Sequence, residues 1–361
     1  MKKTKMSLLR TAFIKPESVL SLDLPQWSQL IRHARRANVL ARLGFYLKTA
    51  GILEKIPAQP LLHIKSSLTF AKAFECSLQW EIHCIEAALK PLGIPLVFLK
   101  GSAYYVAGNS AAKGRIFSDI DILVPENRLL EVEVALINAG WITSILDPYD
   151  QKYYRQWMHE IPPMRHLKRQ TSIDVHHNIL PKTCKFSPDA NKLLANTVQI
   201  PGTNAWVLAP EDRVLHSATH LFNGGEFEQG FRDLSDLDLL LKEFASQENF
   251  WTQLRHRAEV LNQQTALCYA LRYTNKILNT PIPPEILNNA ANRGNAKLSL
   301  FFLDLLFVSA LQPGYGCPNN PWTEIARFCL FVRSHWLKMP VSLLLPHLLK
   351  KSLKQMNKLI A

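Results

Sequence analysis

The pattern of apolar and polar residues predicts helices over the first quarter of the chain. Between residues 26 and 92, apolar side chains recur at helical spacing, beginning with Trp27 and Leu30. The stretch Leu68–Leu89 continues without glycine or proline. We therefore expect a helical N-terminal element over residues 1–91.

A strand, a turn and a helix are predicted next. The apolar run Ile94–Leu99 predicts a short strand, which ends at the turn Lys100-Gly101-Ser102. The small residues of Ala103–Gly108 then favour a helix.

The following segment alternates between polar and apolar residues. Within residues 116–124, Asp119 and Asp121 occupy one face of a predicted half-buried strand, and isoleucines occupy the other. An amphipathic helix over Arg128–Ala139 comes next, and Gly140 is suited to closing it.

A β-hairpin is predicted between residues 157 and 179. Its strands are Trp157–Leu167 and Thr171–Ile179, and the second strand places Asp174 and His176 on one face. The Pro-Pro pair at positions 162–163 indicates that the first strand is irregular or lies at an edge.

Beyond Pro181 the strand pattern ends and helical stripes follow. The predicted helices are Glu211–Phe222, Leu234–Phe244, Phe250–Leu261, Thr265–Leu278, Lys297–Leu311 and Thr323–Trp336. The fold class is therefore α+β, with a core of mixed strands flanked by helices over residues 92–180. An all-α C-terminal domain is expected over residues 181–361.

The composition points to an anionic partner. The 42 Lys and Arg residues outnumber the 29 Asp and Glu residues, which gives a formal net charge of +13. The chain after Leu330 has no acidic residue but six basic ones, namely Arg333, Lys338, Lys350, Lys351, Lys354 and Lys358. We expect a docked helix with a solvated basic face there, and contact with RNA or an acidic membrane surface is the alternative.

A cytoplasmic location is expected. The six cysteines form no CxxC pair, which argues against a zinc cage or a disulfide framework. The basic N-terminus lacks a convincing signal-peptide cleavage site. The most apolar run, Leu298–Leu311, contains Asp304 and is shorter than the roughly 20 residues of a transmembrane helix, so we expect a buried helix there.

Three carboxylates form a candidate metal site. Asp119 and Asp121 project side by side, and oxygen ligands of this kind bind hard divalent cations. Asp174 on a neighbouring strand would complete the ligands of a catalytic ion and accept the proton of an acceptor hydroxyl. Two magnesium ions about 4 Å apart would then bind the attacking and leaving oxygens of a phosphoryl displacement.

The turn before the first helix is a candidate phosphate site. At Gly101 and Ser102, backbone N–H groups and a hydroxyl can approach triphosphate oxygens at the start of a helix. Lys100 and Arg115 flank this region and can neutralise phosphate charge. Taken alone, the two aspartates could be an ordinary exposed strand face, and the Gly-Ser turn could be an ordinary helix start. Their order along the chain indicates that they form one site.

This constellation resembles the DNA polymerase β-type nucleotidyltransferase superfamily, and more narrowly a bacterial group of uncharacterised nucleotidyltransferases. The motifs that carry the resemblance are Lys100-Gly101, Arg115, Asp119-Ile120-Asp121, His159-Glu160, Asp174-Val175-His176 and, further on, Glu211-Asp212, His216, His220, Arg232-Asp233 and Asp236. The resemblance covers residues 90–242.

The resemblance implies an enzyme that transfers a nucleoside monophosphate from an NTP, with ATP as the expected donor, onto an unidentified hydroxyl of a small molecule or protein. Two readings stay open beside it: a non-catalytic nucleotide-binding protein, and an RNA-end nucleotidyltransferase. His159, Glu160 and His176 are candidates for orienting a metal ligand. His216 and His220 favour a structural or acceptor-side role, and the acids after Arg232 favour helix capping and ion pairing.

Overall fold

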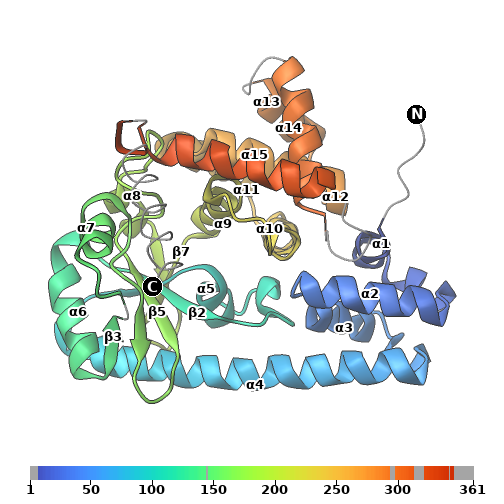
Figure 1. Cartoon of the computed structure of the whole chain (residues 1–361), viewed down its shortest axis with the longest axis horizontal. Coiled ribbons are helices and arrows are strands. Elements are labelled where there is room, and N and C mark those ends of the chain that lie inside the picture. The colour runs from blue at the N-terminus through green and yellow to red at the C-terminus, as the bar shows by residue number, and fades with distance from the viewer. Residues whose placement is uncertain (1–6, 144, 293–296, 313–320, 341, 345–361) are drawn as a thin grey trace, which may run out of the picture.

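A seven-stranded mixed sheet forms the left half of the molecule in the computed structural model (Figure 1). The structure describes residues 7–143, 145–292, 297–312, 321–340 and 342–344. The strands are β1 (Leu96–Phe98), β2 (Asp119–Leu123), β3 (Trp141–Thr143), β4 (Met164–His166), β5 (Ser172–His176), β6 (Thr197–Gln199) and β7 (Ala205–Leu208). Their order across the sheet is β3-β4-β5-β2-β1-β7-β6. The predicted α+β class is confirmed.

The strand pairings combine both directions. Strand β2 is antiparallel to β1 and parallel to β5, while β4 and β5 form the predicted antiparallel hairpin. The prediction that strands end before Pro181 is wrong, because β7 pairs in parallel with β1 and carries β6 on its other edge. The sheet thus draws on residues well beyond position 180, although the proposed division of the chain into three domains stays a prediction.

Helices surround the sheet and extend to its right in Figure 1. They are α1 (Leu8–Ile14), α2 (Leu24–Arg36), α3 (Leu40–Thr49), α4 (Ala58–Leu89), α5 (Lys100–Val106), α6 (Leu129–Asn138), α7 (Pro148–Trp157), α8 (Ala190–Leu194), α9 (Pro210–Gly224), α10 (Gly230–Phe244), α11 (Phe250–Val260), α12 (Gln264–Leu278), α13 (Pro284–Asn292), α14 (Lys297–Ala310) and α15 (Pro321–Lys338). All six helices predicted after Pro181 are present.

The N-terminal segment is helical, as predicted, and we call its helices α1–α4 the N-terminal platform. Helix α2 begins at a capping box, in which the Asp23 side chain accepts a hydrogen bond from the Gln26 backbone and the Gln26 side chain accepts one from the Asp23 backbone. Helix α4 runs beneath both α2–α3 and the sheet (Figure 1). It therefore joins the two halves of the molecule.

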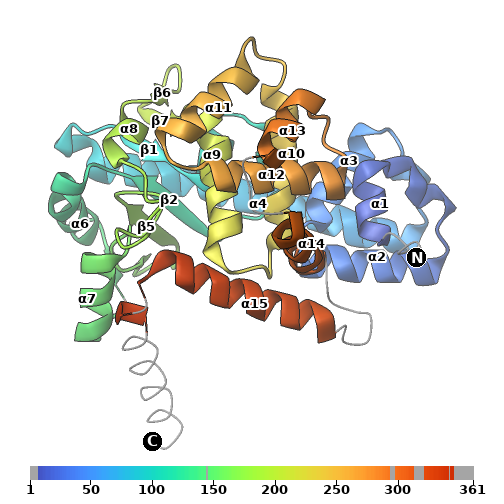
Figure 2. The same ribbon diagram turned by 90° about the horizontal axis from the view of Figure 1, so that it is seen from above.

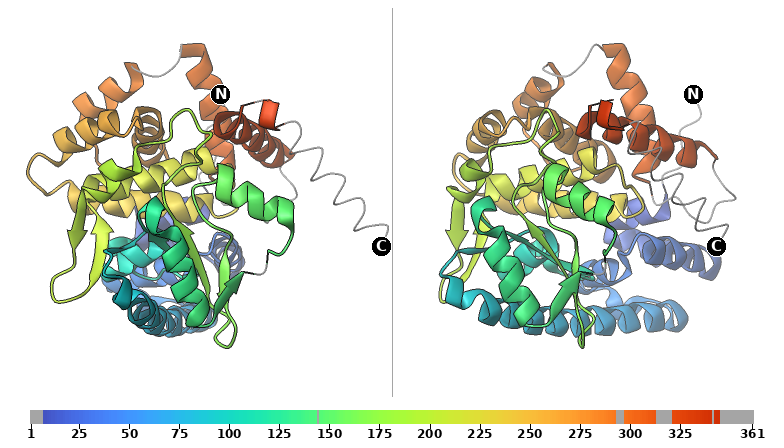
Figure 3. Two further views of the ribbon diagram at one scale, coloured as in Figure 1. Left: turned by 90° about the vertical axis from the view of Figure 1, so that its left-hand side faces the viewer. Right: turned by 60° about the vertical axis from the view of Figure 1, so that its left-hand side comes forward.

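The β4–β5 hairpin is anchored at its turn. The ring of His166 accepts hydrogen bonds from the backbones of Lys168 and Arg169, and the Arg169 guanidinium forms an ion pair with buried Glu81 of α4. Figure 3 shows the hairpin lying beside α4. Only three residues of the predicted strand 157–167 belong to β4, because Trp157 ends the unpredicted helix α7 and the Pro-Pro pair cannot take part in regular strand pairing.

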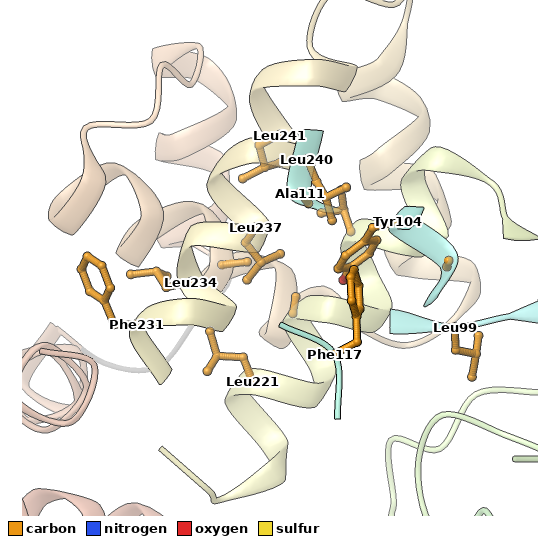
Figure 4. Close-up of a cluster of buried hydrophobic side chains, with 14 of the residues drawn as sticks. Leu99, Tyr104, Ala111, Phe117, Leu221, Phe231, Leu234, Leu237, Leu240 and Leu241 are labelled. Atoms are coloured by element: carbon orange, nitrogen blue, oxygen red, sulfur yellow. The ribbon is translucent and has the colours of Figure 1, made fainter. Parts of the chain in front are cut away.

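A leucine-rich face of α10 joins the sheet to the helical region. Leu234, Leu237 and Leu241 are fully buried. Figure 4 shows them in one cluster with Tyr104 and Phe117, which come from α5 and the segment before β2. This packing holds α10 against the part of the sheet that carries the candidate residues.

Helix α14 differs from the buried helix that we expected. Phe301 is 65% exposed, and Phe302 and Leu305 are also exposed. Asp304 forms ion pairs of 2.6 Å with Arg272 and Lys276 of α12. Phe301 and Phe302 face outward, whereas Phe307 at the other end of the helix is buried. Figure 2 shows α15 beside α14 at the outside of the helical region.

The structure bears on the membrane and cysteine expectations for the residues that it describes. None of the helices in this part of the chain is long and apolar enough to cross a membrane. The five cysteines of the described residues are all free thiols. The basic tail after Leu344 lies outside the described residues.

A buried arginine links α3 to the sheet region. Arg42 is 1% exposed, and its guanidinium donates hydrogen bonds to the Ala111 carbonyl and the Ser235 hydroxyl, both at 2.5 Å. The same group lies 2.6 Å from Asp236 of α10. A buried cation with this many partners is costly to remove, because the partners lose their hydrogen bonds.

We predict that Arg42→Met lowers the free energy of unfolding by about 3 kcal/mol, since it leaves a buried carboxylate and carbonyl short of partners. Urea denaturation would measure the loss. The matched control is Arg32→Ala, because Arg32 is exposed on α2 and its removal should change stability by less than about 0.5 kcal/mol. Equal losses in both variants would contradict the structural role of Arg42.

Candidate functional site

A cavity of about 190 Å³ opens where β2, α5, α9 and α10 meet. It contains five of the residues that the sequence singled out for metal or phosphate binding. Its lining comprises Lys100, Gly101, Tyr104, Arg115, Phe117, Ser118, Asp119, Asp121, Ser217, His220, Glu226, Arg232, Asp233 and Asp236. Charged side chains of both signs thus dominate the wall.

The strand register brings the acidic residues together. In the parallel β2–β5 pair, Asp121 lies directly opposite Asp174. Asp121, Asp174 and His176 each offer a ligand atom, and these three atoms lie within 4.8 Å of one another. Asp119 and Asp121 line the cavity, whereas Asp174 and His176 are not among its lining residues. Asp119 is outside the tight group, and its carboxylate accepts a hydrogen bond from the Ser118 hydroxyl at 2.6 Å.

Asp121 is held between two cationic or potentially cationic groups. Its Oδ1 atom lies 2.6 Å from Lys100 Nζ and 2.9 Å from His176 Nε2. Burial alone would raise the pKa of Asp121, but Lys100 and His176 outweigh it and hold that pKa well below the ordinary value. Asp121 is only 2% exposed, so β2 is more deeply buried than the half-buried strand that we expected.

Asp174 has the opposite electrostatic environment. Burial, followed by repulsion from Asp121 and Glu160, raises the pKa of its carboxyl to about 7. No cation of the described residues forms an ion pair with it. Asp174 therefore exchanges its proton near neutral pH, which suits an acid–base group.

The turn at the start of α5 has the strain of a functional turn. Lys100 adopts a left-handed backbone conformation with φ of 47°, which is unfavourable for a residue with a Cβ atom. Gly101 is needed because a Cβ atom there would lie 2.8 Å from Arg115 Nε and 3.0 Å from Phe117. Ser102 is buried, and its hydroxyl donates hydrogen bonds to the carbonyls of Leu99 and Asp121 rather than facing the cavity.

Arg115 is positioned by an acid on α10. Its guanidinium pairs with Asp236, which also binds Arg42 on the far side. Burial would lower the pKa of Arg115, but Asp236 and Asp233 raise it, so the side chain stays charged. Arg232 lies 2.8 Å from Asp233 at the cavity wall. The acids of this helix thus form ion pairs, as expected, and Asp236 additionally packs against the site.

His159 and Glu160 lie beside the end of β5, as predicted. Backbone hydrogen bonds join His177 to His159 and Ile161 to Val175. Glu160 Oε2 then lies 3.4 Å from His176 Nδ1, on the ring edge opposite Asp121. Glu160, His176 and Asp121 thus form a row of polar side chains across the ends of β5 and β2.

Several lining residues had no signal in the sequence. Tyr104 and Ser217 line the cavity from α5 and α9, and Glu226 follows the left-handed Gly225 that ends α9. His220, for which the sequence favoured a structural or acceptor-side role, also lines the cavity, and burial followed by the Lys100 charge keeps its pKa well below the ordinary value. Only the packing of α9 and α10 against α5 brings these side chains to the site.

Comparison with known proteins identifies the family of the chain. The model of a family described as uncharacterised nucleotidyltransferases matches residues 23–279. The match spans the sheet, the cavity and the helices that support them. No match was found among curated proteins or among solved structures.

We predict that Asp174 makes the metal-free protein less stable as pH rises. A carboxyl whose pKa is raised in the folded state retains a proton that the unfolded chain has lost, so stability falls as pH rises from about 4 through about 7. Between about pH 5 and about pH 8 the wild type should lose about 2 kcal/mol more than Asp174→Asn does.

Urea denaturation at several pH values, in the presence of a chelator, measures this difference. Glu54→Gln is the control, because Glu54 is an exposed acid that pairs with Lys65 on the surface. Its pH dependence should match that of the wild type. A wild-type slope equal to that of Asp174→Asn would show that Asp174 titrates normally.

Proposed function

Because the chain belongs to the family of uncharacterised nucleotidyltransferases, we propose that it transfers a nucleoside monophosphate from an NTP, with ATP as the expected donor, to a hydroxyl acceptor, and that magnesium is required. The observation that carries this proposal is the pairing of Asp121 with Asp174 across β2 and β5, with Asp119 on the cavity that Lys100 and Arg115 line.

The donor atoms suit magnesium. Asp119, Asp121 and Asp174 offer carboxylate oxygens, which are the ligands that hard divalent cations prefer. The crowding of Asp174 by other carboxylates, which raises its pKa, is the repulsion that a divalent cation relieves. When bound by these three residues, magnesium supplies positive charge that offsets the charge developing on phosphoryl oxygens.

The cavity fits the phosphate end of a nucleotide. Its volume of about 190 Å³ is below the roughly 300–1,000 Å³ of typical small-molecule sites, so the base and sugar would extend outside it. Lys100, Arg115 and Arg232 provide cations at its wall. A guanidinium matches phosphate geometry well, which favours the two arginines as triphosphate ligands.

The transfer step needs one proton acceptor. The acceptor oxygen forms a bond to the α-phosphorus, the bond from that phosphorus to the bridging oxygen breaks, and pyrophosphate leaves. The hydroxyl proton passes to the carboxylate of Asp174. Lys100 and Arg115 are placed to stabilise the negative charge of the departing phosphates.

A labelling experiment tests the proposal. The protein is incubated with magnesium, cell extract and each α-labelled NTP in turn, and label transfer is compared between wild type, Asp121→Asn and Asp174→Asn. We expect each substitution to lower transfer at least about 100-fold, because it removes an oxygen ligand or the proton acceptor. Asp189→Asn is the control, since Asp189 is an exposed helix cap that asparagine replaces well.

The outcomes separate the candidate functions. Equal transfer in all four proteins would rule out the proposed site. Nucleotide binding that depends on Asp121, with no transfer in any protein, would favour a non-catalytic nucleotide-binding protein. Label found on RNA, with binding that weakens steeply as salt rises, would identify an RNA-end transferase.

We also predict that Gly101→Ala weakens NTP binding about 10-fold, because the new methyl group would displace Arg115 and Phe117 from the cavity wall. Isothermal titration calorimetry with magnesium and ATP measures the affinity. Gly224→Ala is the control, since no atom lies within 4 Å of a Cβ atom built there. Unchanged affinity in Gly101→Ala would show that the turn does not position the phosphate ligands.

A further inference from the structure

The imidazole of His176 lies between two carboxylates. The side chain is 1% exposed, and its Nε2 atom lies 2.9 Å from Asp121 Oδ1. An ionised carboxylate can only accept a hydrogen bond, so Nε2 is the donor in this contact. Nδ1 of a neutral ring then carries a lone pair.

That lone pair faces Glu160. The distance from His176 Nδ1 to Glu160 Oε2 is 3.4 Å, and Nδ1 forms no hydrogen bond within the described residues. Two acceptor atoms that face each other in a buried place need a positive group between them. The separation is close to the roughly 3.3 Å between two ligand atoms of a tetrahedral zinc ion with bonds of about 2.0–2.1 Å.

A second imidazole completes the group. The rings of His159 and His176 lie with their centres 5.2 Å apart, and His159 Nδ1 is buried without a hydrogen-bond partner among the described residues. His159, Glu160 and His176 offer three ligand atoms within 4.8 Å of one another. The backbone hydrogen bonds between this segment and the end of β5 hold the three side chains on a rigid support.

We propose that His159, Glu160 and His176 Nδ1 bind a divalent transition metal, with zinc as the best fit, at a site separate from the Asp119–Asp121–Asp174 carboxylates. Two imidazoles and one carboxylate are a ligand set of zinc sites that leave one position for water, whereas magnesium prefers oxygen ligands alone. His176 would bind the metal through Nδ1, while its Nε2 atom donates a hydrogen bond to Asp121.

The shared histidine connects this metal to the carboxylates. A metal-binding histidine usually donates its other N–H group to a carboxylate, which fixes its tautomer and orientation. Asp121 is that carboxylate here. Zinc on Nδ1 therefore keeps the proton on Nε2 and positions Asp121. The inference does not rest on the proposed function, because metal binding at these residues requires no nucleotide.

Metal content and cobalt spectroscopy test the proposal on the full chain. The protein is purified without added metal and analysed by mass spectrometry for zinc. A chelator-treated sample is then titrated with Co²⁺, whose visible absorption reports coordination by nitrogen and oxygen ligands. We expect about one zinc ion per chain and a saturable cobalt spectrum.

Substitutions assign the ligands. Glu160→Gln and His159→Asn should each weaken zinc and cobalt binding by at least about 10–100-fold. The matched control is His177→Asn: His177 lies in the same segment, but its ring contacts the Met158 carbonyl and Glu126 and is not part of the group. Circular dichroism checks that each variant is folded.

Two results would overturn the proposal. One is the absence of bound zinc together with no cobalt spectrum in the wild type. The other is equal cobalt binding in Glu160→Gln, His159→Asn and His177→Asn. Asp119→Asn separates the sites, since it should keep zinc even if magnesium-dependent nucleotide binding is lost.

Discussion

The parallel pairing of β2 with β5 imposes the constraint on which the candidate site depends, because it fixes two buried carboxylates side by side. Repulsion between Asp121 and Asp174 is strong where water is scarce. The protein relieves it unevenly: Lys100 and His176 keep Asp121 charged, while Asp174 retains its proton until about pH 7. In the metal-free protein one acid is thus charged, while its neighbour across the strand pair titrates near neutral pH.

Local sequence patterns predicted the strands that carry these acids, but not that β2 and β5 pair in parallel. Strict alternation placed Asp119 and Asp121 on one face, and both line the cavity. The Lys100-Gly101 turn was recognised as the end of β1. Glycine is needed at this turn because Arg115 lies close to its backbone. The hairpin with Asp174 and the later helices were also predicted, because each depends on residues a few positions apart. The assignment of magnesium and nucleotide to these residues stays a prediction.

Features that depend on distant contacts could not be predicted. Strand β7 is a short apolar segment without alternation, and its partner β1 lies about a hundred residues earlier. The helix Pro148–Trp157 was missed because this segment contains few apolar residues and is followed by a proline pair. Ser102 looked like a phosphate ligand, yet its hydroxyl bonds to nearby carbonyls once the turn folds over β2.

Asp236 of α10 connects the cavity to the N-terminal helices. One oxygen binds Arg115 at the cavity, and the other binds Arg42 from the N-terminal platform. Two cations therefore share one buried acid, and moving α10 would leave both arginines without this partner. The family match at residues 23–279 includes both helices and ends before α14. The contacts of Asp236 therefore connect α3 and α10 to the cavity, whereas α14, with its exposed Phe301 and Phe302, lies outside the matched residues.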